Sequence, residues 1–275
     1  MAKLAETIKT YQHDAPSGVV FFGAPDDLGV RLNGGRPGAA RGPAAFRDAL
    51  ARYGSAEATA WPTLYDAGDI EPAGELEETH GRVAERAASV LRAGHFCVMI
   101  GGGHDLTLPF VRAVIEERGP LAGVYFDAHL DVREETGSGM PFRRLIEDCG
   151  VSSLVVHGLD PRVNAREHAD YFESQGGRIA SSDLAEPWPE GPKFVSFDLD
   201  VIDQAHAPGV SAQNPAGWTG REAVVWAERA GRDPSVACFD IMELSPPYDE
   251  GGRTARFAAA VFVSFCRGFA ARCEP

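Results

Sequence analysis

The 275-residue chain is 44% hydrophobic and 24% charged, which is typical of folded globular proteins and excludes a disordered chain. Its formal net charge of −14 argues against nucleic acid or an anionic membrane surface as a partner. No stretch approaches the roughly 20 apolar residues that cross a bilayer, and residues 1–11 lack the apolar core of a secretory signal. Five cysteines without a CxxC pair fit a reducing compartment, so we expect a cytoplasmic protein.

Short apolar runs alternate with longer amphipathic stretches along the chain. In chain order, this pattern predicts a strand at 19–22, a helix at 43–53, a helix at 75–92, a strand at 96–100, a helix at 106–117, a strand at 123–126, a strand at 154–156, a helix at 162–174, a strand at 194–197, a helix at 220–230, a strand at 236–239 and a helix at 256–272. The alternation indicates an α/β fold with a mostly parallel sheet and helices on both faces. No fixed-period repeat or interdomain linker is present, so we expect residues 1–275 to form one domain.

Four of the predicted strands are followed at once by polar side chains. These segments are GGGHD at 101–105, DAHLD at 127–131, DLDVID at 198–203 and DIME at 240–243. In open parallel sheets, ligands bind outside the carboxyl ends of the strands. We therefore expect the four segments to meet in one crevice.

The DAHLD segment carries three potential metal ligands at alternate positions. Asp127, His129 and Asp131 share one face if the end of the strand is fully extended. Crowded carboxylates repel one another and take up protons, and a divalent cation removes that cost. The alternative is a polar turn whose carboxylates are merely solvated.

The other segments extend this candidate metal site. Asp198 and Asp200 alternate after another apolar run, where the alternative is an exposed acidic loop. His104 follows three glycines, which also suit an anion cradle, but no Lys-Ser/Thr follows them and a P-loop is excluded. Two histidines and four aspartates form a mixed N/O donor set that suits ions such as manganese better than a thiolate zinc site. Six ligands are too many for one ion with an open position, so we expect two.

The segments GGGHD, DAHLD, SFDLDVID with APGVSA, and FDIMELSPP resemble the signature blocks of the ureohydrolase family, which includes arginase, agmatinase and formimidoylglutamase. The resemblance covers residues 23–250 and implies a three-layer α/β/α domain and a homo-oligomer, either a trimer or a hexamer. It also implies two Mn²⁺ per chain. One ion would be held by His104, Asp127, Asp131 and Asp198, and the other by Asp127, His129, Asp198 and Asp200. Glu243 matches the carboxylate that pairs with the substrate's amidine or guanidine cation, and Asp200 is a candidate proton donor to the leaving amine.

A loop after DAHLD points to one branch of the family. Arginase and agmatinase carry a histidine there, whereas this chain has Ser138, and the segment SGMPF resembles formimidoylglutamase except that Met140 replaces the usual threonine. The expected reaction converts N-formimidoyl-L-glutamate to L-glutamate and formamide, a step of histidine degradation.

Such a substrate brings two carboxylates into an acidic protein and needs cationic partners. Arg133, Arg143 and Arg144 flank the loop and are the expected suppliers, with surface ion pairs as the alternative role. An agmatinase or a guanidino-acid ureohydrolase that releases urea is the alternative activity. A non-catalytic metal-binding relative and a zinc deacetylase of related fold are the other options.

Overall fold

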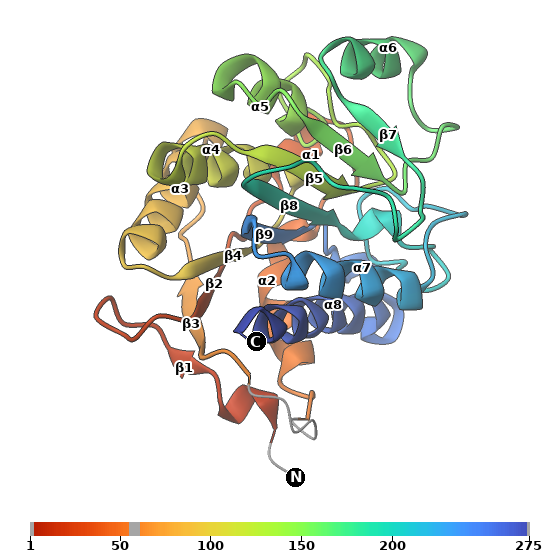
Figure 1. Cartoon of the computed structure of the whole chain (residues 1–275). Helices are drawn as coiled ribbons and strands as arrows, with labels where there is room; N and C mark the ends of the chain where they lie inside the picture. Colours follow the sequence, from red (N-terminus) through yellow and green to blue (C-terminus); the bar gives the residue numbers. More distant parts are fainter. Residues whose placement is uncertain (1–2, 55–60, 274–275) are drawn as a thin grey trace.

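A computed structural model describes residues 3–54 and 61–273 of the chain. Its strands form a single sheet in the order β1-β3-β2-β4-β9-β8-β5-β6-β7, and every neighbouring pair is parallel (Figure 1). The strands are β1 (Lys9–Thr10), β2 (Val19–Gly23), β3 (Leu64–Asp69), β4 (Phe96–Ile100), β5 (Ala122–Phe126), β6 (Leu154–His157), β7 (Arg178–Ala180), β8 (Lys193–Asp198) and β9 (Val236–Met242). The predicted parallel sheet is therefore confirmed.

Helices cover both faces of this sheet. They are α1 (Leu28–Leu32), α2 (Gly42–Leu50), α3 (Leu76–Arg92), α4 (Thr107–Arg118), α5 (Pro141–Cys149), α6 (Arg166–Ser174), α7 (Gly220–Arg232) and α8 (Arg253–Ala270). One core cluster joins the sheet to α2, α7 and α8, and a second joins the other face to α3, α4, α5 and α6. Figure 1 shows α7 and α8 side by side on one face and α3 beside α4 on the other. The result is the three-layer α/β/α arrangement that the sequence predicts.

The apolar runs become strands because each is buried on both faces. In β2, Val19 and Phe21 belong to the core under α2 and α8, while Val20 and Phe22 belong to the opposite core. All four side chains are at most 1% exposed. Side chains that alternate between two helical layers produce the continuous apolar run of a central parallel strand.

Every element predicted from the sequence is present, with shifted ends. The helix predicted at 162–174 begins at Arg166, and the strand predicted to end at Phe239 continues to Met242. The sequence reasoning missed β1, β3, β7, α1 and α5. Strands β1 and β7 are too short to show a period, and the polar residues of β3 interrupt its alternation. Helix α5 has only nine residues between Pro141 and the left-handed Gly150. Such a short segment, bounded by proline and glycine, resembles a loop in the sequence.

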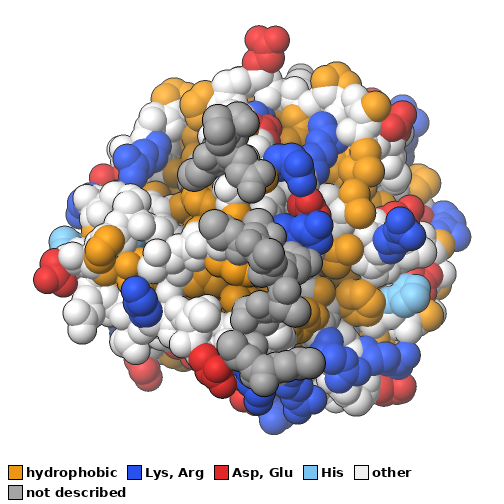
Figure 2. All heavy atoms as spheres, turned by 60° about the horizontal axis from the view of Figure 1, so that its bottom comes forward, with side chains coloured by type: hydrophobic (Ala, Val, Ile, Leu, Met, Phe, Trp, Pro, Cys, Tyr) orange, Lys and Arg blue, Asp and Glu red, His pale blue; other side chains and the backbone are white. Residues whose placement is uncertain are grey.

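The surface mixes charges of both signs. Figure 2 shows Lys and Arg side chains gathered with apolar and acidic ones on one face, although the net charge is −14. A face of this acidic protein can therefore carry basic groups, and the charges close to a site affect which small ions bind there more than the net charge does. Within the described residues, no helix combines the length and the apolar character needed to cross a membrane.

Candidate metal centre

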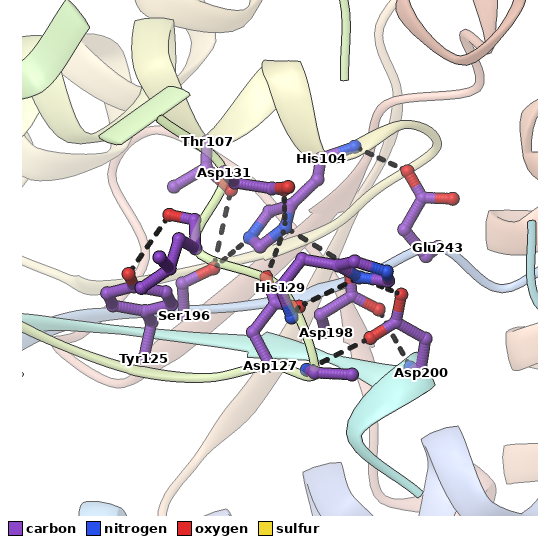
Figure 3. Close-up of polar contacts among 12 residues, drawn as sticks. His104, Thr107, Tyr125, Asp127, His129, Asp131, Ser196, Asp198, Asp200 and Glu243 are labelled. Carbon is purple, nitrogen blue, oxygen red and sulfur yellow. Dashed lines mark hydrogen bonds and ion pairs between the residues drawn. The ribbon is translucent and has the colours of Figure 1, made fainter. Parts of the chain in front are cut away.

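Four neighbouring strands bring the predicted site residues together. β4, β9, β8 and β5 are adjacent in the sheet, so their carboxyl ends lie at one edge. The loops after these strands carry the side chains drawn in Figure 3: His104 after β4, Glu243 after β9, Asp198 and Asp200 at the end of β8, and Asp127, His129 and Asp131 after β5. All four segments meet, as the strand-end argument predicts.

The first cluster gathers around His104. Its Nδ1 atom lies 3.2 Å from Asp127 Oδ2, 3.0 Å from Asp131 Oδ2 and 3.1 Å from Asp198 Oδ2. His104, Asp127 and Asp198 are buried, and Nδ1 makes no hydrogen bond with proper geometry. Nδ1 and Asp127 Oδ2 are both buried without a hydrogen-bond partner, so the four facing donor atoms form an arrangement suited to an ion between them.

The second cluster shares Asp127 with the first. His129 Nδ1 lies 3.4 Å from Asp127 Oδ1 and 3.0 Å from Asp200 Oδ2. By distance Asp198 groups with the first cluster, and its Oδ1 atom accepts a hydrogen bond from the backbone N–H of Asp200 at 2.8 Å. Asp127 is therefore the carboxylate that faces both clusters.

The DAHLD segment reaches this arrangement by a turn, which differs from the extended strand end expected from its alternation. β5 ends at Phe126, and Asp131 has a φ of 49°. As a result, Asp127 and Asp131 face His104, while His129 faces Asp200 (Figure 3). The turn distributes the three side chains between two clusters.

A buried chain of polar groups orients His104 from behind. Its Nε2 atom lies 2.9 Å from Ser196 Oγ, which donates to Asp240 Oδ1 at 2.5 Å. Thr107 donates to the other oxygen of Asp240 at 2.9 Å. With Nε2 held in this way, Nδ1 is left facing the carboxylates. The sequence analysis missed Ser196 and Thr107, and it placed Asp240 after a strand that in fact continues past it to Met242.

Glu243 occupies a strained position beside the first cluster. Its φ is 67°, and together with Asp131 it makes up the non-glycine residues with positive φ in the described part of the chain. Its Oε1 atom accepts the backbone N–H of His104 at 2.8 Å, whereas Oε2 is buried without a partner. Strain of this kind persists where the surrounding structure holds a functional group in place. The free oxygen is suited to accept a hydrogen bond from a bound cation.

The glycines before His104 allow a close approach of two loops. The backbone N–H of Gly103 donates to Asp26 O at 2.9 Å, and that of Glu243 donates to Gly102 O at 2.9 Å. A Cβ atom on Gly102 would overlap the backbone of Asp26. The three glycines therefore let the backbone before His104 approach the backbone of Asp26 and of Glu243 closely.

The clusters concentrate negative charge in a place with little water. Burial raises the pKa of Asp127 to about 6, and Asp131 and Asp200 add to the shift. Burial also raises the pKa of Asp198 and of Glu243, with further contributions from neighbouring carboxylates. This crowding costs free energy unless cations offset it. Two imidazoles and four carboxylates fit a pair of divalent ions such as manganese.

A pocket of about 330 Å³ opens over these clusters. We call the seven residues His104, Asp127, His129, Asp131, Asp198, Asp200 and Glu243 the floor. We call the surrounding residues Asn33, Gly34, Gly35, Arg36, Arg133, Ser138, Ser211 and Ala212 the rim. Val163, Asn164 and His168 line a third side.

Of the five residues expected to bind substrate, three line the pocket and two do not. Glu243 lies in its floor. Arg133 and Ser138 belong to the rim. Arg143 lies on α5, where it contacts Glu134 and Glu147 at 2.9 Å and stacks on a tyrosine ring. Arg144 lies 3.4 Å from Glu147 on the same helix. Helix α5 directs these two arginines to acidic neighbours, which is the alternative role that the sequence left open for them.

The sequence analysis missed two basic residues of the pocket. Arg36 lies in a loop rich in glycine, and nothing near it in the sequence indicates which site it faces. His168 has no ligand-like spacing in the sequence, yet it lies on α6 and lines the pocket. Arg36 lies in the connection after β2 and His168 in the connection after β6, so only the folded chain brings them to the same pocket.

Comparison with known proteins agrees with this architecture. A sequence model of the Arginase family matches residues 17–267. A formimidoylglutamase from Aromatoleum aromaticum is 36% identical, with 97% of this chain and 88% of that protein covered. A proclavaminate amidinohydrolase from Streptomyces clavuligerus is 31% identical, with 88% and 85% covered. The crystal structure of Trypanosoma cruzi formiminoglutamase with Mn²⁺ has a TM-score of 0.91 and 33% identity over 98% of this chain and 99% of that one. The chain therefore belongs to the arginase family.

Proposed function

We propose that this protein is a binuclear manganese hydrolase that converts N-formimidoyl-L-glutamate and water to L-glutamate and formamide. The observation that carries the proposal is the pairing of an acidic floor with two arginines, Arg36 and Arg133, on the rim of the same pocket. The floor suits metal ions and an amidinium group, and the arginines suit carboxylates. Agmatine is cationic at both ends and has no group for these arginines. The formimidoylglutamase relative and the manganese-containing formiminoglutamase structure support this choice.

The two clusters supply the ligands. His104, Asp127, Asp131 and Asp198 would hold one ion, and Asp127, His129 and Asp200 would hold the other, with Asp198 adjacent. Manganese supplies Lewis acidity, which makes water a stronger nucleophile near neutral pH. The chain's own residues then have to orient the substrate and move protons.

Glu243 orients the substrate in this mechanism. Its unpartnered Oε2 atom accepts a hydrogen bond from the amidinium group, while the His104 N–H holds Oε1 in place. Water adds to the amidine carbon, and the bond from that carbon to the glutamate nitrogen breaks. The departing amine needs a proton. Asp200 takes one from the attacking water and transfers it to the amine through Oδ1, the oxygen that faces the Ala128 N–H rather than His129.

Ser138 occupies the position where arginase and agmatinase carry a histidine. It is 8% exposed, it lines the pocket, and its backbone N–H donates to Gly29 O at 2.9 Å. A hydroxyl at this place leaves proton transfer to the floor. In this proposal Ser138 binds substrate without exchanging a proton at neutral pH.

The setting of the enzyme is part of the same proposal. Family resemblance supports a homo-oligomer, a trimer or a hexamer, which light scattering of the purified protein tests. The cysteines Cys97, Cys149, Cys238 and Cys266 are free, which supports a cytoplasmic location. The fifth cysteine, Cys273, has its side chain outside the described residues.

The test is a product assay with the manganese-loaded protein. Formimidoylglutamate, agmatine and arginine are offered separately, and formamide, glutamate and urea are measured. We expect formamide and glutamate in equal amounts and little urea, with activity abolished by chelation. Urea from agmatine with no formamide from formimidoylglutamate would make the protein an agmatinase. A chain with its full metal content and no turnover on any substrate would make it a non-catalytic relative.

A further inference from the structure

Several contacts hold the side chain of Arg36 at the wall of the pocket. Its Nε atom donates to Ser211 O at 3.2 Å, and its Nη2 atom donates to Val210 O at 2.5 Å. The guanidinium carbon lies 4.1 Å from the centre of the Tyr248 ring. Two segments distant from Arg36 in the sequence, residues 210–211 and Tyr248, thus fix the guanidinium group in one orientation.

The charge of Arg36 is not neutralised by the protein. No carboxylate in residues 3–54 and 61–273 lies within ion-pair distance of it, and its hydrogen bonds go to neutral carbonyl groups. Nη1 donates to no acceptor in that part of the chain. By contrast, Arg31, five residues earlier, lies 2.9 Å from Asp27. A fixed guanidinium with free N–H groups at a pocket wall is suited to bind a carboxylate.

The carbonyl groups that hold Arg36 belong to the framework that holds Glu243. Ser245, two residues after Glu243, donates its backbone N–H to Gly209 O at 2.7 Å. The backbone N–H of Gly209 in turn donates to Thr254 Oγ1 at 2.8 Å. Val210 and Ser211, which accept from Arg36, follow directly. One short stretch of hydrogen-bonded backbone therefore connects Glu243, which is suited to bind a cation, with Arg36, which is suited to bind an anion.

The loop that carries Arg36 is fixed at its other end as well. Asp27 Oδ2 accepts the backbone N–H of Gly38 at 2.6 Å. Gly38 has a φ of 150°, and a Cβ atom there would press against Ser245 and Pro247. A substrate carboxylate that binds Arg36 thus meets a group that is already ordered, so little conformational entropy is lost on binding.

We propose that Arg36 is a specificity-determining residue that binds one carboxylate of the substrate, while Arg133 binds the other. The inference rests on the proposed function, because formimidoylglutamate is the amidine that brings two carboxylates to the pocket. An amidine with a single carboxylate satisfies one arginine and leaves the other without an anion. The rim thereby selects dicarboxylates, and the floor performs the chemistry.

The experiment compares Arg36→Gln and Arg36→Lys with wild type. Arg41→Gln is the matched control, because Arg41 is an exposed arginine on the following segment that does not line the pocket. The substrates are formimidoylglutamate and two analogues, N-formimidoyl-4-aminobutyrate, which lacks the α-carboxylate, and N-formimidoyl-2-aminobutyrate, which lacks the γ-carboxylate. For formimidoylglutamate we expect Arg36→Gln to raise KM about tenfold to 150-fold with a small change in kcat, as for a lost charge-assisted hydrogen bond. Arg36→Lys recovers part of this loss, and Arg41→Gln behaves as wild type.

The analogues identify the carboxylate that Arg36 binds. For the analogue that lacks the carboxylate bound by Arg36, we expect Arg36→Gln and wild type to have the same KM. For the other analogue, we expect the KM of Arg36→Gln to be raised. An unchanged KM for formimidoylglutamate, or an equal loss against both analogues, overturns the inference. Manganese content and the thermal unfolding midpoint show whether each variant is intact, and Arg36→Lys carries the test if Arg36→Gln does not fold.

Binding of the product separates this inference from the proposed function. Calorimetry with L-glutamate and the manganese-loaded protein requires no turnover. Weaker binding by Arg36→Gln than by Arg41→Gln supports the role of Arg36, and equal binding overturns it. Failure of the proposed function is recognised differently, as the absence of formamide release by the wild-type protein.

Discussion

The floor and the rim of the pocket are built in opposite ways. The floor residues follow β4, β5, β8 and β9, and most of them are buried. The rim comes from loops around residues 33–36, 133–138 and 211–212, and its side chains are largely half-buried or exposed. A sheet edge places groups accurately because every strand is held by its neighbours, whereas a loop is placed by whatever it happens to contact. We therefore expect the floor to determine the chemistry and the rim to determine which substrate reaches it.

The two regions also differ in how charge is balanced. In the floor, carboxylates crowd together and require cations, and two residues adopt left-handed backbone conformations. On the rim, Arg36 is held by neutral carbonyl groups and a ring, and its positive charge is left for a ligand. Changes in the floor are therefore expected to alter metal content and kcat, and changes on the rim to alter KM.

Asp127→Asn is expected to have the largest effect, because Asp127 faces both clusters. Asparagine keeps the shape and removes the charge, so the protein should bind fewer than two manganese ions and lose about three orders of magnitude in kcat. Metal analysis and formamide release provide the measurements. Asp203→Asn changes the last acid of the DLDVID segment, which is in neither cluster, and should keep both ions. Two bound ions and full turnover in Asp127→Asn would show that the ions do not share this carboxylate.

Glu243→Gln separates substrate orientation from metal binding within the floor. The substitution removes a charge-assisted hydrogen bond worth about 1.5–3 kcal/mol, so kcat/KM should fall roughly tenfold to 150-fold. Manganese content should stay at the wild-type level. The exposed Glu250→Gln is the control and should leave kcat/KM unchanged. Normal kcat/KM in Glu243→Gln would remove Glu243 as the group that orients the amidinium.

Ser196→Ala tests whether the floor depends on groups behind it. Without the Ser196 hydroxyl, His104 Nε2 loses its partner and the imidazole is free to turn, so manganese affinity should fall by about 10- to 100-fold. Competition with a metal-binding dye measures that affinity. Asp240→Asn should show the same direction, because Asp240 accepts from Ser196. The exposed Ser174→Ala serves as the control. Wild-type affinity in both buried variants would mean that the carboxylates alone position His104.

Arg133→Gln tests the expectation that the rim acts on KM. We expect KM for formimidoylglutamate to rise about tenfold with little change in kcat, and added salt to reduce the difference, since Arg133 is exposed. Arg144→Gln should leave both constants unchanged, because Arg144 pairs with Glu147 outside the pocket. The opposite pattern, with Arg144 affecting KM and Arg133 having no effect, would contradict the placement of these arginines.

His157 lies at the end of a strand but belongs to neither the floor nor the rim. We therefore expect its substitution to change stability and to leave activity unchanged. It lies at the carboxyl end of β6, donates from Nδ1 to Ser181 O at 2.8 Å and accepts from Trp188 Nε1 at 3.1 Å. Burial lowers its pKa to about 4. The unfolded chain therefore takes up a proton between the ordinary pKa of about 6.5 and this lower value, so stability is complete above pH 6.5 and falls as the pH drops towards 4.

The size of the effect follows from that shift and amounts to about 3 kcal/mol of unfolding free energy. Denaturant unfolding of the metal-free protein at pH 7 and at pH 4.5 measures it. His157→Gln removes the titrating group and should reduce the pH dependence, while kcat/KM at pH 7 stays at the wild-type level. The exposed His206→Gln should retain the full dependence. Equal pH dependence in His157→Gln and wild type would show that other groups dominate acid destabilisation.

The floor was open to prediction from the sequence because its residues are tied to strands. An apolar run followed at once by Asp127 or Asp198 indicates a strand end, and parallel strands place their ends at one edge. Which ligands belong to which cluster was harder to predict from the sequence. Alternation placed Asp127, His129 and Asp131 on one face, but the turn at Asp131 separates His129 from the other two.

The rim was decided by tertiary structure. Arg133, Arg143 and Arg144 are close in sequence and equally charged, yet only Arg133 lines the pocket, because α5 carries the other two towards Glu134 and Glu147. Arg36 reaches the pocket from the opposite end of the chain. Side-chain chemistry and the period of an element can be recognised locally, so the sequence by itself determined the fold class and the set of candidate metal ligands. Which distant loops meet depends on packing between layers, and that decided which arginines face the substrate.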